Sequence, residues 1–209
     1  MPESNAPSNA PSPKNTRREE ILQAGIEVLA SDGWQGTTMT KIARRARASK
    51  ETLYAWFGDK SGFFTELVEL RAWRLDASLN DVLKGDVAAA LSAWGEAVLG
   101  QYVGPDSIAL HRAAISEAGR SDLGGILAFG GRGASMPRLA RWLEAQAHAG
   151  RLSLPEGPLE AAEDYLALLK GDAQLLCLLD AAAPLRPAEI TRRAARATKL
   201  FLRLYAAPA

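Results

Sequence analysis

The sequence predicts an all-α protein, and three observations support that fold class. Apolar residues recur at helical spacing in successive segments of the 209-residue chain. No segment shows the strict alternation of a half-buried strand. Two short helical patterns lie close together between Thr38 and Lys60, which is the layout of a helix-turn-helix whose second helix enters the DNA major groove. We therefore expect an N-terminal three-helix domain of this kind, followed by a larger helical domain.

Composition restricts the class of protein further. With 47% hydrophobic and 23% charged residues, the chain can bury a core in one large or two small domains. Its single cysteine, Cys177, excludes an internal disulfide and a multi-cysteine metal site, and it suits a reducing compartment. The sequence has neither an apolar run of membrane-spanning length nor a signal-peptide pattern. We expect a cytoplasmic protein that does not enter a membrane.

Charge is distributed unevenly along the chain. Between Lys14 and Lys60 there are nine lysines and arginines against six aspartates and glutamates, a local charge of +3 in a chain of net charge +1. A basic excess suits a polyanionic partner, although solvated helix surfaces carry such an excess too.

The N-terminal part is expected to contain a tail and a first helix. Residues 1–14 are rich in Pro, Ser, Asn and Ala, which predicts disorder. Thr16 and Glu19 have the spacing of a capping box, so the first helix is expected to start there. Gly33 is a suitable left-handed stop for it.

The expected helix-turn-helix spans residues 39–58. Thr38 and Ser49 are natural N-caps for its two helices. Helical spacing directs five side chains inward, namely Ile42, Ala43, Ala46, Leu53 and Phe57. The other side of the second helix faces solvent or DNA. The spacing alone does not decide between solvent and DNA, because any pair of short amphipathic helices shows the same spacing.

This segment resembles the DNA-binding domain of the TetR (tetracycline-repressor) family. The family pattern runs T-x-x-x-I-A-x-x-A-G-V-S-x-G-x-L-Y-x-Y/H-F-x-x-K-x-x-L. Here it is matched by Thr38, Ile42, Ala43, Ala46, Ser49, Leu53, Tyr54, Phe57 and Lys60, with Phe63 at the last apolar position. The resemblance covers roughly Thr16 to Leu75, and we expect a DNA-binding domain at 15–75. It implies a bacterial, nucleoid-associated regulator whose partner is a double-stranded DNA operator.

The resemblance also implies roles for individual residues. Thr38, Tyr54 and Lys60 would hold backbone phosphates, which gives affinity and register without sequence choice. Base edges would be contacted by a second group, namely Ser49, Lys50, Glu51, Thr52 and Ala55. Thr40 and Arg47 complete the expected DNA contacts. Simple solvation remains the alternative for each of these side chains.

Two positions depart from the family pattern. Arg47 and Ala48 replace Gly-Val in the turn, where a left-handed non-glycine residue costs on the order of 1 kcal/mol. A phosphate contact by Arg47 would offset part of that cost. Glu51 replaces a glycine and adds negative charge to the expected DNA face.

The rest of the chain is expected to form an effector-binding and dimerisation domain at 76–209. A connecting helix with Asp59 as its cap is predicted to run through Phe63, Leu67 and Leu70, as far as about Leu79. Further helices are predicted at 86–103, 106–119, 135–149, 158–180 and 187–205. The glycine-rich stretch at 121–137 lacks the strand and the Gly-Lys-Ser/Thr ending of a phosphate loop, so we expect a flexible connection there.

The last two predicted helices bear on assembly. Between Tyr165 and Leu179 apolar residues occur on nearly every side, so that segment is expected to be buried all round. The final helix carries an apolar stripe, namely Ile190, Ala194, Ala197, Phe201 and Leu204. The resemblance implies a homodimer through 158–180 and 187–205, which would place two recognition helices one DNA turn apart. A purely intramolecular core is the alternative.

The second domain also offers candidate ligand contacts. Aromatic side chains with a few polar anchors are typical of a small-molecule pocket. The candidates are Trp94, Tyr102, His111, Glu117, Phe129, Trp142 and Tyr165, although most aromatic residues at helical spacing simply fill a core. The segments HRAAISEA and LLKGDAQLLCLL resemble the C-terminal region of an efflux-regulator (AefR-like) subgroup. The expected effector is a small hydrophobic or amphipathic molecule.

We therefore expect a homodimeric DNA-binding transcriptional regulator, a repressor released from a palindromic operator by its ligand. No catalytic constellation, metal-ligand spacing or cofactor motif is apparent: His111 and His148 lie far apart, and no paired carboxylates stand out. An enzyme is the competing class that this absence disfavours. A ligand-independent DNA-binding or architectural protein that acts through partner proteins is the other alternative.

Overall fold

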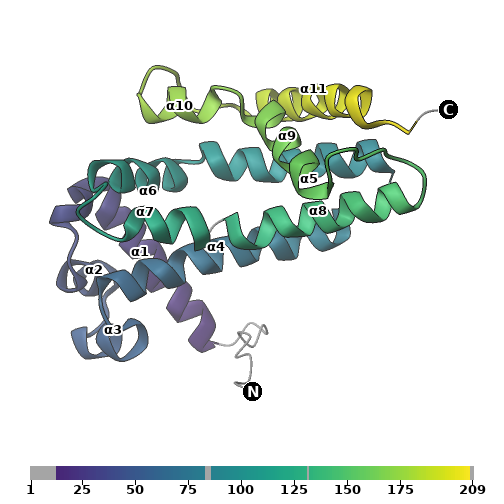
Figure 1. Cartoon of the computed structure of the whole chain (residues 1–209). Coiled ribbons are helices and arrows are strands. Elements are labelled where there is room, and N and C mark those ends of the chain that lie inside the picture. The colour runs from purple at the N-terminus through teal and green to yellow at the C-terminus, as the bar shows by residue number, and fades with distance from the viewer. Residues whose placement is uncertain (1–12, 83–85, 131, 208–209) are drawn as a thin grey trace. The chain divides into compact units, whose positions relative to one another are not determined.

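The computed structural model describes residues 13–82, 86–130 and 132–207, and every regular element in these ranges is helical. The predicted all-α class is confirmed. The chain forms two compact units, Met1–Phe63 and Phe64–Ala209, each with its own core. Figure 1 shows the succession of helices. The predicted domain limits, 15–75 and 76–209, remain a prediction.

The described helices fall into three groups along the chain. The first unit contains α1 (Pro13–Gly36), α2 (Met39–Ala46) and α3 (Lys50–Phe57). Helix α4 (Lys60–Val82) begins in the first unit and continues into the second. The second unit continues with α5 (Val87–Val103), α6 (Pro105–Ser116), α7 (Leu123–Gly125), the π-helix η1 (Ile126–Gly130), α8 (Arg132–His148), α9 (Pro158–Lys170), α10 (Ala173–Leu178) and α11 (Pro187–Tyr205).

The predicted start of the first helix is wrong. Helix α1 begins at Pro13, so Thr16 lies within its first turn and is not its cap. Proline suits a first helical turn because its fixed φ is helical and its missing N–H has no partner there. Residues 1–12 of the predicted tail lie outside the described residues. Gly33 does take a left-handed φ of 66° and interrupts the helix, as expected.

The core of the first unit depends on a glycine of α1. Phe63 is fully buried, and a Cβ atom on Gly25 would lie 2.3 Å from its ring. Any larger residue would therefore displace the ring. The ring of Phe57 meets Phe63 edge-on at a centroid distance of 4.8 Å. This contact connects the end of α3 to the start of α4.

The core of the second unit is centred on α5, α9 and α11, with α8 packed against α9. An aromatic row runs through it, from Trp94 through Tyr165 and Phe201 to Tyr205. Gly95 makes this possible, since a Cβ atom there would lie 2.5 Å from the Tyr165 hydroxyl. That hydroxyl donates to the Leu91 carbonyl oxygen at 2.6 Å. A residue without a side chain is thus required where α9 crosses α5.

Three details of the second unit differ from the sequence predictions. The helix predicted at 158–180 is broken into α9 and α10 at Gly171, which has a φ of 48°. The predicted all-round burial is wrong in one subunit, because Leu175 and Leu179 are 56% and 66% exposed. Leu204 is 66% exposed, and Tyr205 occupies the core in its place.

The glycine-rich segment also differs from its prediction. Leu123 to Gly130 forms the short α7 and the π-helix η1, where we expected a flexible connection. Leu123 is fully buried, so one apolar side chain anchors this segment in the core.

Candidate nucleic-acid interface

The helix-turn-helix is built as its caps predict. The hydroxyl oxygen of Thr38 accepts from the Lys41 amide at 3.2 Å and starts α2. Ser49 accepts from the Thr52 amide at 3.0 Å and starts α3. The Thr38 cap uses its oxygen as an acceptor, so its O–H group can still act as a donor to a phosphate. All five predicted inward-facing residues are buried, namely Ile42, Ala43, Ala46, Leu53 and Phe57.

The turn between the two helices is left-handed at Arg47, as predicted. Its φ and ψ are 51° and 45°, a conformation that costs most non-glycine residues about 1 kcal/mol. A guanidinium from α1 closes the end of α2, because Arg17 Nη2 donates to the carbonyl oxygens of Ala46 at 2.6 Å and of Arg47 at 3.0 Å. Carbonyl groups at a helix C-terminus lack intrahelical donors, and the Arg17 guanidinium supplies the missing donor.

The neighbouring arginine acts in the same way on α3. Arg18 Nη2 donates to the Trp56 carbonyl oxygen at 2.9 Å. Its guanidinium lies 4.8 Å from the centre of the Phe57 ring, a cation–π distance. Arg17 and Arg18 therefore position both helices of the motif, a role that the sequence analysis missed. The only sequence signal was an Arg-Arg pair at the start of an amphipathic helix.

The predicted DNA contacts lie in the first unit and are mostly exposed. Eight of them are exposed on or next to α2 and α3, namely Thr38, Thr40, Arg47, Ser49, Lys50, Glu51, Tyr54 and Ala55. Tyr54 is 53% exposed, which is unusual for a large ring. Thr52 is partly buried. The outer face of α3 is thus open to a partner, although Thr52 Oγ1 is 3.0 Å from the Ser49 hydroxyl.

Glu51 is held in its ionised form at the start of α3. A hydrogen bond from its own backbone N–H lowers the pKa of its carboxyl group, and the Ser49 hydroxyl and the Lys50 charge act in the same direction. The N-terminal end of a helix also favours a negative charge. This fully exposed side chain therefore presents a carboxylate, which accepts hydrogen bonds and repels phosphate.

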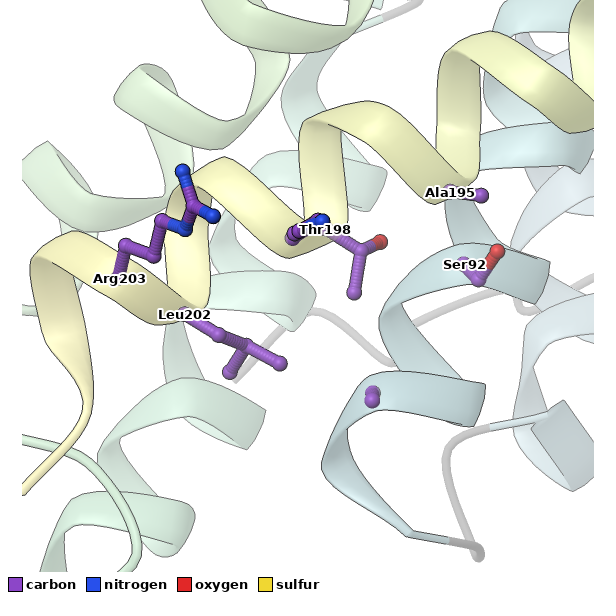
Figure 2. Close-up of a pocket in the computed structure, with 7 residues that line it drawn as sticks. Ser92, Ala195, Thr198, Leu202 and Arg203 are labelled. Carbon is purple, nitrogen blue, oxygen red and sulfur yellow. The ribbon is translucent and has the colours of Figure 1, made fainter.

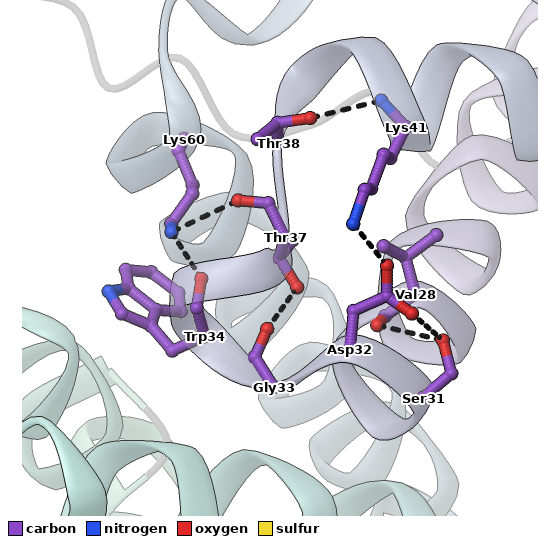
Figure 3. Close-up of polar contacts among 9 residues, drawn as sticks. All are labelled: Val28, Ser31, Asp32, Gly33, Trp34, Thr37, Thr38, Lys41 and Lys60. Atoms are coloured by element: carbon purple, nitrogen blue, oxygen red, sulfur yellow. Dashed lines mark hydrogen bonds and ion pairs between the residues drawn. The ribbon is translucent and has the colours of Figure 1, made fainter.

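Lys60 is the least exposed of the predicted cationic contacts. Its Nζ donates to the carbonyl oxygens of Trp34 at 2.6 Å and of Thr37 at 3.2 Å, and it lies 3.8 Å from the Trp34 ring centre. The ammonium therefore connects the end of α1 to the start of α4. Figure 3 shows these two hydrogen bonds and, beside this junction, the ion pair of Lys41 Nζ with Asp32. The two charged atoms of that pair are 2.6 Å apart.

The candidate ligand residues are placed in different environments. Trp94 and Tyr165 are both fully buried, with ring centroids 5.8 Å apart. The indole Nε1 of Trp94 is buried and has no acceptor among the described residues. His111 Nδ1 is 2.7 Å from the carbonyl oxygen of Ser107, one turn earlier on α6.

The other candidates lie on several different helices. The Lys170 ammonium lies 4.9 Å from the ring centre of Tyr102. Glu117 is only 5% exposed. Trp142 packs on the rim of the core. The side chain of Phe129 lies outside the described part of the chain.

A groove lies between α5 and α11 (Figure 2), and one residue of its lining, Thr198, has its hydroxyl 3.0 Å from the hydroxyl of Tyr165. Its volume is about 490 Å³, and its lining is Ala88, Ser92, Ala195, Thr198, Lys199, Leu202 and Arg203. None of the predicted ligand residues belongs to this lining. Its lining is mainly apolar and includes two cations, Lys199 and Arg203.

Within the ranges 13–82, 86–130 and 132–207, no group of three or more His, Cys, Asp and Glu side chains is placed to hold a metal ion. None of the helices described there combines the length and the apolar character needed to cross a membrane.

Two family models match the chain. The model for bacterial regulatory proteins of the tetR family matches residues 21–67, and the model for the C-terminal domain of AefR-like transcriptional repressors matches residues 89–207. Together they cover parts of both compact units. Each match contains residues that we predicted to bind DNA or a ligand.

Solved structures of similar proteins extend over nearly the whole chain. A TetR regulator from Agrobacterium tumefaciens is 28% identical, with a TM-score of 0.76 over 94% of this chain and 96% of its own. The flavonoid-responsive regulator FrrA is also 28% identical, with a TM-score of 0.72 over 93% and 100%. A TetR-family regulator from Mesorhizobium loti, 23% identical with a TM-score of 0.78, supports the fold alone.

Curated relatives match over a shorter length. The nucleoid occlusion factor SlmA of Edwardsiella ictaluri is 38% identical over 74 residues, which is 35% of this chain and 37% of SlmA. The chain therefore matches less than two-fifths of the length of these relatives.

Proposed function

The chain belongs to the TetR family as a DNA-binding transcriptional regulator with an AefR-like C-terminal domain, and we propose that it is a ligand-released repressor. In this proposal a homodimer binds a palindromic operator, and a small hydrophobic or amphipathic molecule favours a conformer that no longer fits adjacent major grooves. A coupling free energy of about 1 to 3 kcal/mol would give roughly 5- to 150-fold release.

The observation that carries the DNA-binding part of the proposal is the open face of α3. Its exposed side chains include a donor cation, an acceptor carboxylate and a methyl group, which are Lys50, Glu51 and Ala55. These groups suit guanine, cytosine and thymine respectively. Thr38, Thr40, Arg47, Tyr54 and Lys60 are proposed as phosphate contacts, and Ser49 and Thr52 as further base contacts.

Homodimerisation is supported by apolar exposure near the C-terminus. Six large hydrophobic side chains of the described residues are strongly exposed, and four of them lie on or next to α9, α10 and α11. These four are Leu159, Leu175, Leu179 and Leu204, between 47% and 66% exposed. Exposed leucines on neighbouring helices suit a surface that another subunit covers. We therefore propose the region 158–205 as the dimer interface.

Ligand response is supported by the buried indole of Trp94. A buried donor without an acceptor costs about 1 to 3 kcal/mol, and an oxygen atom of a ligand would remove that cost. The name of FrrA describes that relative as flavonoid-responsive. We propose that this chain also binds a small molecule in its second unit, through Trp94 and others of the predicted residues, namely Tyr102, His111, Glu117, Phe129, Trp142 and Tyr165.

We propose a cytoplasmic, nucleoid-associated regulator without catalytic activity. The ligand-independent architectural alternative receives less support, because the similarity to a nucleoid occlusion factor spans 74 residues. The similarity to regulators spans 93% or more of the chain.

Selection from a random duplex library tests the proposal directly. The full chain would be used to enrich bound DNA, and the enriched fragments would be sequenced. We expect a palindrome whose half-sites are centred about one helical turn apart. The dimer on that DNA is then exposed to a metabolite library that includes flavonoids, and at least one compound should release it. Binding without any sequence enrichment would contradict the operator proposal, and enrichment without release would support the architectural alternative.

A further inference from the structure

The groove between α5 and α11 combines apolar surface with positive charge. Figure 2 shows that one side of it is formed by α11 and the other by α5. Three of its lining residues are apolar, namely Ala88, Ala195 and Leu202. Two are cations, Lys199 and Arg203, which are one helical turn apart on α11. No acidic side chain belongs to the lining that the described residues form, so the groove is amphipathic and positively charged.

Neither cation of the groove has an anionic partner within residues 13–82, 86–130 and 132–207. The ion pairs that α11 forms in this part of the chain involve Arg186 and Arg193 instead. Lys199 and Arg203 are both exposed, and like charges four residues apart repel each other along a helix. A bound anion would reduce that repulsion, so the groove favours a negatively charged ligand.

A short chain of hydrogen bonds gives the groove a buried acceptor. Thr198 belongs to the lining although it is only 4% exposed, and its hydroxyl oxygen is 3.0 Å from that of Tyr165. The Tyr165 hydroxyl donates to the Leu91 carbonyl oxygen at 2.6 Å. Because a tyrosine hydroxyl has only one proton to donate, Thr198 is the donor in its contact with Tyr165. The Thr198 oxygen keeps its lone pairs and can accept a hydrogen bond from a ligand.

The groove lies on the flank of α11 that faces away from Leu204. Leu204 follows Ala195 by nine residues, which places the two side chains about 180° apart around a helix that turns about 100° per residue. A subunit that covers Leu204, as in the proposed dimer, therefore contacts a different flank of α11. The groove can remain open to a small molecule in such a dimer.

We propose that this groove binds a small organic carboxylate that has a compact apolar body and a hydroxyl group. The carboxylate pairs with the two cations, because carboxylates accept strong charge-assisted hydrogen bonds from ammonium and guanidinium groups. The apolar body covers the three apolar residues, and the hydroxyl group donates to Thr198. The groove volume of about 490 Å³ is in the range of small-molecule sites. None of the lining residues is among the ligand contacts proposed above, and binding here does not depend on the proposed release from DNA.

Three carboxylates of increasing length serve as probes, namely para-hydroxybenzoate, para-hydroxyphenylacetate and para-hydroxyphenylpropionate. Two analogues of each lack one recognised group, since the primary amide lacks the charge and the methyl ether of the phenol lacks the donor. Isothermal titration calorimetry of the full chain without DNA measures the dissociation constants. At least one carboxylate should bind with a dissociation constant below about 1 mM. Its amide should bind about tenfold or more weakly, and its methyl ether about threefold or more weakly.

Substitutions in the groove test each contact against the matching analogue. In Lys199→Gln with Arg203→Gln, the carboxylate and its amide should bind with nearly equal affinity. In Thr198→Val, the phenol and its methyl ether should bind with nearly equal affinity, whereas Thr198→Ser retains the hydroxyl and should retain the difference.

Arg192→Gln with Arg196→Gln is the matched control for the two cations of the groove. Both arginines are exposed, and they are one turn apart on α11 but outside the lining. This variant loses the same charge, and it should keep the wild-type preference for the carboxylate over the amide. Thermal unfolding verifies that each variant is folded.

The outcomes separate this inference from the proposed function. The groove site would be overturned if none of the three carboxylates bound at about 10 mM, or if the wild type bound carboxylate and amide equally. An equal loss of preference in the control variant and in the groove variant would overturn it too. A carboxylate that binds in the groove without releasing the chain from its selected DNA would support the site and count only against the ligand-released repressor.

Discussion

The ammonium nitrogen of Lys60 lies 3.8 Å from the centre of the Trp34 ring and donates a hydrogen bond to the Trp34 carbonyl oxygen at 2.6 Å. A second bond to the Thr37 carbonyl oxygen, at 3.2 Å, completes the junction. Thr37 directly precedes Thr38, the cap of α2. The cation that the family resemblance assigns to a phosphate is therefore also a structural element of the helix-turn-helix.

We expect Lys60→Met to affect both stability and DNA binding. Loss of the two hydrogen bonds and the cation–π contact should lower the melting temperature by a few degrees, about 2 to 4 °C per kcal/mol for a chain of this size. Loss of one phosphate contact should reduce the slope of log Kobs against log salt by about 0.9. Weaker binding with an unchanged slope would restrict Lys60 to the structural role.

Arg47→Gly should stabilise the protein and weaken its binding to DNA. Glycine takes the left-handed conformation of this turn without strain, which is worth about 1 kcal/mol. Removal of the guanidinium deletes a proposed phosphate contact. Thermal unfolding and a binding titration measure the two effects. Ala48→Gly is the control, since Ala48 has no positive φ, and it should not raise the melting temperature.

Glu51→Gln should change sequence preference more than overall affinity. The carboxylate is ionised at the start of α3 because its pKa is lowered, first by its own backbone N–H. A glutamine accepts and donates, so it suits adenine where a carboxylate suits the cytosine amino group. Binding to a set of single-base operator variants measures the change. Equal tightening on every variant would mean that Glu51 only repels the phosphates.

Trp94→Phe should reduce the response to ligand without destabilising the chain strongly. Phenylalanine keeps much of the aromatic surface but removes the buried N–H that lacks an acceptor. Burying that N–H costs about 1 to 3 kcal/mol. Removing this cost offsets the packing energy that is lost with the smaller ring. The test compares ligand-induced release from DNA with that of Trp73→Phe, because Trp73 is partly buried and is not one of the predicted ligand residues. Release that is weakened equally in both variants, or in neither, would argue against a hydrogen bond from Trp94 to the ligand.

Two tyrosines should make the protein sensitive to alkaline pH. Burial raises the pKa of Tyr165 to about 12, and the hydrogen bond to Asp164 raises the pKa of Tyr205 to about 12. An unfolded tyrosine loses its proton near pH 10, so the folded state retains the proton over a wider range. Their contribution to stability is complete below about pH 10 and is lost as the pH rises towards 12.

Urea denaturation at about pH 9 and about pH 11 measures this contribution. The free energy of unfolding should fall less between these pH values in Tyr165→Phe and in Tyr205→Phe than in the wild type. An equal fall in all three proteins would contradict the role of these hydroxyl groups.

The sequence by itself determined the features that depend on near neighbours. The caps at Thr38 and Ser49, the inward side chains of α2 and α3, and the left-handed turn at Arg47 were all predicted correctly. These features follow from steric rules and hydrogen bonds that act over three or four residues, so a local pattern contains the necessary information.

Only the tertiary structure decided the contacts between distant segments. Arg17 reaches a carbonyl oxygen 29 residues away, and Lys60 reaches one 26 residues away. The break at Gly171 and the exposure of Leu175 also depend on where α9 and α10 meet their neighbours. Long side chains such as arginine and lysine have many possible partners along the sequence. Packing selects one of them, because folding brings only certain unpaired carbonyl groups within their reach.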